Sequence, residues 1–105
     1  MGLFTKGQSK TLPLKTVKFM LGDDHIFLRE LTSKELLHYQ SKMGDKETTN
    51  IDYLYDIIAR CAVDEDCKPI FASVDEVKNE LNVGLSTLTE MHHAISRVSG
   101  LEGKN

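Results

Sequence analysis

Residues 51–71, IDYLYDIIARCAVDEDCKPIF, decide the fold. Over 51–63 the apolar residues recur at the spacing of one helical face: Ile51, Leu54, Ile58 and Cys61. The acidic run at 64–66 ends this pattern, and Pro69 cannot donate a backbone hydrogen bond. We therefore expect a buried central helix over 51–63, then a tight polar turn, and an aromatic anchor at Phe71.

The composition indicates one small acidic domain. Of its 105 residues, 40% are hydrophobic and 28% are charged, which is ordinary for a globular domain. The formal net charge of −3 argues against a general nucleic-acid binder. Cys61 and Cys67 do not resemble a disulfide framework, so a reduced, cytosolic compartment is the simplest interpretation. The apolar runs are too short for a signal peptide or a membrane span, and we expect no membrane partner.

Residues 14–31 are typical of a β-hairpin. Apolar residues alternate along the first strand, and 22–24, Gly-Asp-Asp, supply turn residues. The expected register sets Leu21 opposite Ile26 and therefore Phe19 opposite Leu28, on one face. On the second face it places Met20 beside Phe27, and Lys18 beside Arg29. Two like charges opposite each other are unfavourable, so we expect an acidic group, either from another segment or from a partner, to balance them.

Capping signals predict the helices around the central one. Thr32 and Glu35 form a capping-box pattern at the start of a helix that runs to about Met43, with Gly44 as its C-terminal cap. Ser73 and Glu76 repeat the pattern before a short helix. The last helix begins at Ser86 or Thr87, repeats the apolar spacing of the central helix, and ends at 99–100, Ser-Gly.

These elements predict an α+β fold in which an N-terminal β-hairpin packs on a bundle of about four short helices. A single domain is expected over residues 12–101. Residues 1–11 form a flexible N-terminal arm, and residues 102–105 form a flexible C-terminal tail.

The residue pattern offers no site for chemistry. A calcium loop that begins at Asp64 would need Gly at its sixth position and Glu at its twelfth, where the chain has Pro69 and Asp75. A zinc site from the two cysteines with His92 and His93 lacks paired ligand spacing, because adjacent histidines point to different helix faces. No serine lies in a glycine-rich elbow, and no P-loop or dinucleotide motif is present. We expect no enzyme activity, no metal and no cofactor.

Three segments in order carry a family resemblance. The first is 29–32, Arg-Glu-Leu-Thr, at the start of a helix after the hairpin. The second is the turn 64–71, DEDCKPIF, and the third is 99–101, Ser-Gly-Leu, at the end of the last helix. The arrangement, over about residues 14–101, resembles the tail assembly chaperones of long-tailed bacteriophages and prophages. One position departs from the pattern, because Cys67 stands where the family usually has Gly.

The resemblance implies a non-catalytic binding protein. Such chaperones coat the apolar tape measure protein, keep it soluble, self-associate along it, and leave as major tail tube subunits arrive. The expected location is the host cytoplasm, and the chaperone is not expected in the mature virion. A small structural tail or connector subunit of the particle is the alternative. The expected partner-binding residues lie on the arm and on the second hairpin face: Leu3, Phe4, Lys18, Phe27 and Arg29.

Overall fold

The computed structural model describes residues 2–43 and 51–101, with residues 41–43 described as backbone only. Within this part, the chain forms a three-stranded antiparallel sheet in the order β1-β2-β3 and four helices. The strands are β1 (Thr16–Leu21), β2 (Asp24–Arg29) and β3 (Ala62–Val63). The helices are α1 (Ser33–Met43), α2 (Ile51–Cys61), α3 (Val74–Glu80) and α4 (Leu85–Val98). The predicted α+β class is confirmed.

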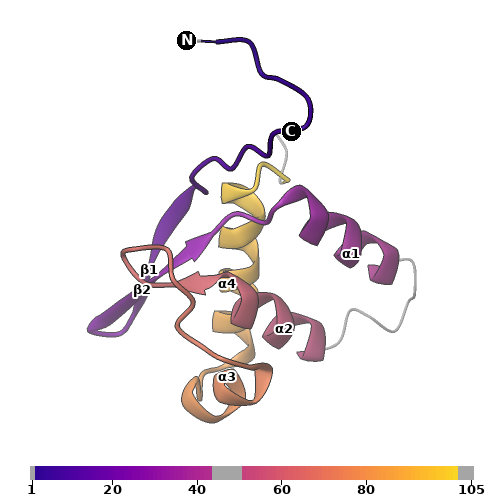
Figure 1. Cartoon of the computed structure of the whole chain (residues 1–105). Coiled ribbons are helices and arrows are strands. Elements are labelled where there is room, and N and C mark those ends of the chain that lie inside the picture. The colour runs from indigo at the N-terminus through magenta and orange to yellow at the C-terminus, as the bar shows by residue number, and fades with distance from the viewer. Residues whose placement is uncertain (1, 44–50, 102–105) are drawn as a thin grey trace.

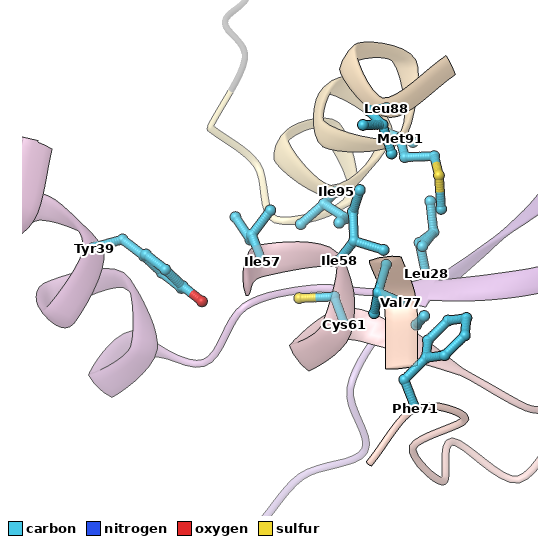
Figure 2. Close-up of a cluster of buried hydrophobic side chains, with 12 residues drawn as sticks. Leu28, Tyr39, Ile57, Ile58, Cys61, Phe71, Val77, Leu88, Met91 and Ile95 are labelled. Atoms are coloured by element: carbon cyan, nitrogen blue, oxygen red, sulfur yellow. The ribbon is translucent and has the colours of Figure 1, made fainter. Parts of the chain in front are cut away.

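The hairpin packs one face on the helices (Figure 1). Helix α4 contacts β1 and β2, and α2 contacts α3, α4 and β2. The buried side chains between these elements form one core, which Figure 2 shows around α2: Leu28, Ile57, Ile58, Cys61, Val77, Leu88, Met91 and Ile95. Ile51 was expected on the buried face of the central helix but is 45% exposed in its first turn, and Ile57 is buried.

The hairpin has the predicted faces but a different register. Phe19 pairs with Ile26 and Lys18 pairs with Phe27, two residues from the expected alignment. The expected pairing of Lys18 with Arg29 is therefore wrong. The reason is the turn, which is tighter than expected: Leu21 pairs directly with Asp24, and only Gly22 and Asp23 lie between them. Gly22 has φ +64°, as the first central position of the favoured two-residue hairpin turns requires.

The central helix ends two residues earlier than its sequence pattern predicts. Ala62 and Val63 form β3 and pair with Leu28 and Phe27 of β2. The Ala62 carbonyl then accepts a hydrogen bond from the Ile70 N–H at 3.1 Å. The neighbouring strand and the returning chain thus satisfy backbone groups that a longer helix would have satisfied internally, because tertiary pairing overrides local propensity.

The N-terminal caps predicted at Thr32 and Ser73 have their expected partners. The Glu35 N–H donates to Thr32 Oγ1 at 3.2 Å, and the Thr32 N–H donates to Glu35 Oε1 at 2.9 Å, which completes the capping box of α1. At α3 the Glu76 N–H donates to the Ser73 hydroxyl. The last helix begins at Leu85, slightly before the expected residues. The expected cap at Gly44 and the expected tail at 102–105 lie outside the described residues.

Helix α4 ends in a Schellman motif. Gly100 has φ +78°, the Leu101 N–H donates to the Ser96 carbonyl at 2.8 Å, and the Gly100 N–H donates to the Arg97 carbonyl at 3.0 Å. The Ser99 hydroxyl accepts a hydrogen bond from the Leu31 N–H at 2.9 Å. This contact ties the entry to α1 to the end of α4.

The acidic turn contains a left-handed residue. Cys67 has φ +64°, a conformation that glycine adopts at lower cost than cysteine. The Cys67 N–H donates to the Asp64 carbonyl at 2.9 Å. The Asp64 carboxylate accepts from the N–H groups of Asp66 and Lys68, at 2.8 and 3.0 Å. These hydrogen bonds hold a left-handed residue that costs about 1–2 kcal/mol for a side chain with a Cβ.

Replacing this residue tests the strain. We expect Cys67→Gly to raise the free energy of unfolding by about 0.5–1 kcal/mol, because relief of the left-handed strain outweighs the extra entropy of glycine in the unfolded chain. Urea denaturation under reducing conditions measures this. Cys67→Val is the control and should lower the free energy of unfolding by about 1 kcal/mol or more, since a β-branched residue tolerates positive φ poorly. A loss of stability in the glycine variant would show that the turn stores no strain.

Candidate functional site

The hairpin face turned away from the helices is the first candidate surface. Leu28 on the helix side is fully buried, whereas Lys18 and Met20 on the other side are exposed. We define the outer hairpin face as the side chains of Lys18, Met20, His25 and Phe27, which the observed register places on one side of the strands. Apolar and charged groups alternate there at close range, which suits reversible contact with a mixed surface.

Phe27 lies at the centre of the outer hairpin face and is half-buried. Its ring meets the His25 ring edge to face, with centroids 5.5 Å apart. Phe27 pairs with Val63, which is fully buried, so one side of Phe27 supports the fold. A hollow of about 160 Å³ adjoins it, lined in part by Ile70, which is 40% exposed, and by the exposed acids Asp64 and Glu65. Phe27 and Ile70 thus form an apolar side of this hollow, and Asp64 and Glu65 form its acidic border.

Arg29, by contrast, makes its polar contacts with other residues of the chain. Its guanidinium donates to both carboxylate oxygens of Glu35, at 2.9 and 2.8 Å, and also to the Glu30 carbonyl at 2.8 Å. The Arg29 side chain is only 12% exposed. The acidic group that we expected near Arg29 therefore comes from the first turn of α1. A bidentate pair of this kind is geometrically specific, and Arg29 serves here as a structural residue.

The Arg29–Glu35 pair continues into a polar network between α1 and α2. The Tyr39 hydroxyl donates to Asp56 Oδ2 at 2.7 Å and accepts from Arg60 Nε at 2.9 Å. Arg60 Nη1 also lies 3.8 Å from Glu35 Oε2. We define the α1 tether as these five residues: Arg29, Glu35, Tyr39, Asp56 and Arg60. A surface hollow of about 510 Å³ borders the tether and reaches to residues 69 and 71–74.

The environment sets the ionisation of the α1 tether. Burial opposes the charge on Glu35, but hydrogen bonds from Arg29 and Thr32 outweigh it and lower the pKa of the carboxyl to about 2. Burial, together with the hydrogen bond to Asp56, raises the pKa of Tyr39. Glu35 is thus a carboxylate and Tyr39 a neutral phenol near neutral pH. Neither is poised for proton transfer at that pH.

The N-terminal arm does not join the outer hairpin face. Leu3 is 96% exposed and Phe4 is 58% exposed, and all residues from Gly2 to Lys10 are exposed. The arm extends away from the domain beyond the start of β1 (Figure 1). The five residues expected to bind partners therefore occupy three places: the arm tip, the outer hairpin face, and the α1 tether.

The thiol of Cys61 is buried in the core. Burial raises the pKa of the Cys61 thiol to about 12, so Cys61 is no nucleophile at neutral pH. In the part of the chain that the structure describes, three or more potential metal-ligating side chains never gather at one point. No helix among the described residues is long and apolar enough to cross a membrane.

Sequence reasoning missed Ile70 as part of this surface, and it missed Tyr39, Asp56 and Arg60 as a network. The alternation of the strands did place Met20 and Phe27 together, and Met20 proves to be 55% exposed. Tyr39, Asp56 and Arg60 carry no shared local pattern. Their contact depends on how α1 docks on α2.

Acid titration tests the α1 tether. Because the folded-state pKa of Glu35 lies below its ordinary value of 4.5, its charge stabilises the fold above about pH 4.5, and this contribution is lost as the pH falls towards 2. We expect Glu35→Gln to lower the free energy of unfolding at pH 7 by about 2 kcal/mol. The difference in the free energy of unfolding between Glu35→Gln and the parent chain should shrink steadily below pH 4.5. Denaturant titrations across this range measure it.

Glu76→Gln is the matched control, since Glu76 caps α3 by accepting from the Ala72 N–H without an arginine partner. Glu76→Gln should lower the free energy of unfolding by about 0.5–1 kcal/mol. Equal losses in the two variants would mean that the Arg29 pair adds nothing beyond a cap.

Comparison with known proteins was made at the level of families, sequences and structures. No family model matches this chain, and no curated protein and no solved structure matches it. The candidate surfaces are therefore described from this chain's own residues.

Proposed function

We propose that this protein is a phage or prophage tail assembly chaperone that binds the tape measure protein and keeps it soluble without catalysis. The proposal is supported by the family resemblance of 29–32, 64–71 and 99–101. The observation that carries it is the outer hairpin face, with Ile70 beside it. This surface leaves apolar side chains uncovered between charged ones and offers no reactive group.

The chemistry of this surface suits a helical, apolar client. Ile70 and Met20 remain 40% and 55% exposed, so a client that covers one of them gains about 1 kcal/mol of hydrophobic free energy. One such contact is weak and quickly reversible. Many copies along a long client add their contacts through high effective concentration, and arriving tail tube subunits can then displace them one at a time.

The proposed setting is the host cytoplasm, with the major tail tube protein as the competitor for the client. A chaperone of this kind is absent from purified virions, whereas a structural tail or connector subunit is present in many copies. Mass spectrometry of purified particles separates these two functions.

A co-expression assay tests client binding. The tape measure protein encoded beside this chain should be soluble when the two are expressed together and should aggregate when expressed alone. Ile70→Gln removes an apolar contact beside Phe27, and we expect about fivefold weaker client binding. Leu37→Gln is the matched control, because Leu37 is a 66% exposed apolar residue on α1, outside the outer hairpin face.

Phe27→Ala separates the two roles of Phe27. If the variant keeps its unfolding transition and loses the client, Phe27 acts in binding. If it unfolds, Phe27 acts chiefly in packing against Val63. A client that stays aggregated with the parent chain present would overturn the proposed function.

A further inference from the structure

A second surface lies at the far end of the hairpin. A groove of about 360 Å³ runs between the hairpin tip and the segment that joins α3 to α4. It is lined from the hairpin tip, the end of α3, the joining segment and the start of α4: Met20, Leu21, Gly22, Glu80, Leu81, Asn82, Val83 and Thr87. Its apolar walls are Met20 from β1 with Leu81 and Val83 from the joining segment. Glu80, which lines the groove, is exposed, and so are Asp23 and Asp24, which follow the lining residue Gly22 in the hairpin turn. The groove is thus apolar inside and acidic at its edge.

The N-terminal arm has the opposite character. Its tip presents Leu3 and Phe4, which stand 96% and 58% exposed. Its charged residues before β1 are all basic, and residues 1–22 contain no Asp or Glu. The arm therefore combines two adjacent apolar side chains with the cations of Lys6 and Lys10, and it matches the groove in both polarity and charge.

The arm and the groove lie at opposite ends of β1. The arm joins the strand at its first residue, Thr16, and the groove begins at its last residues, next to the turn (Figure 1). Six residues of strand separate the two, which corresponds to roughly 20 Å. A contact between one molecule's arm and another's groove would therefore use different surfaces on the two partners. Such heterologous contacts leave a free arm and a free groove at the ends, and they generate rings or open chains.

We propose that the arm tip of one molecule, Leu3 and Phe4, docks in the groove beneath the hairpin tip of a second copy of this chain, with Lys6 and Lys10 facing Asp23, Asp24 and Glu80. This head-to-tail contact would provide the self-association that the family resemblance implies. Its biological role rests on the proposed function. Its test uses this chain alone. Failure here leaves the co-expression result unchanged, and failure of client binding leaves this contact unchanged.

Light scattering across concentration measures the contact. The parent chain should gain mass with concentration, and Leu3→Ser/Phe4→Ser should remain a monomer at concentrations at least tenfold higher. Both positions lie on an exposed arm, so folding is preserved, and far-UV circular dichroism checks this. Leu12→Ser is the matched control: Leu12 is a 66% exposed leucine outside the arm tip, and its variant should associate like the parent.

Charge exchange tests the pairing of the two surfaces. Lys6→Glu/Lys10→Glu on the arm should shift the association midpoint to about fivefold or higher concentration, and so should Asp23→Lys/Glu80→Lys on the groove. All four changes in one chain restore the complementarity and should return the midpoint close to that of the parent. A quadruple variant weaker than either double variant would overturn the pairing.

Mixing tests the head-to-tail direction. Leu3→Ser/Phe4→Ser has an intact groove, and Asp23→Lys/Glu80→Lys has an intact arm tip. Because the two charge changes alone shift the association midpoint only about fivefold, the groove variant also carries Val83→Ser, which removes an apolar side chain from the groove. Its fold is checked by its unfolding transition. Each defective chain alone should stay monomeric. An equimolar mixture of the two variants should stop at a one-to-one dimer, because the intact arm tip of the groove variant can dock in the intact groove of the arm variant. Each variant mixed with the parent should shorten the parent's chains by capping one end.

Two results would overturn the inference. One is a parent chain that stays monomeric at every concentration, as docking of the arm in its own molecule's groove would give. The other is an arm variant that associates as the parent does, as pairing through the free edge of β1 would give.

Discussion

The bidentate pair between Arg29 and Glu35 is the contact on which the placement of α1 depends. Among α1 residues 33–40, Tyr39 is the one that is buried, so this helix contributes little apolar surface to the core. A helix of 11 residues is marginal without tertiary support. The ion pair supplies such support at the helix start, and the Tyr39 hydroxyl supplies it one turn later through Asp56 and Arg60. Figure 2 shows the Tyr39 ring reaching from α1 towards α2.

The segments that carry the family resemblance lie at joints of the fold. Arg29 and Thr32 connect the hairpin to α1, and the turn around Cys67 returns the chain from β3 towards α3. Ser99 holds the Leu31 backbone from the far end of the chain. The polar groups of these residues form hydrogen bonds and ion pairs within the chain. Contact with other molecules is therefore best sought on the outer hairpin face, the arm and the groove, where side chains remain uncovered.

Much of this fold could be predicted from the sequence because helices and caps are local. The capping box of Thr32 and Glu35 lies within four residues, and the alternation of β1 determines which side chains share a face. The register was wrong by two residues, because alternation fixes the face of Phe19 but not its partner. Strand β3 was missed since two residues carry no periodicity. The partner of Arg29 could not be predicted because it depends on how α1 docks. The groove could not be predicted because it forms only where α3 and the hairpin tip meet in space.

The two thiols of this chain differ sharply in access. Cys61 is sealed in the core, whereas Cys67 is partly open in the turn beside the outer hairpin face. A maleimide dye therefore attaches at Cys67 first, and the native protein offers a single labelling position without cysteine removal. Asp64, Glu65 and Ile70 of the same turn line the hollow beside Phe27, so the emission of a fluorophore at Cys67 should change when that surface is covered.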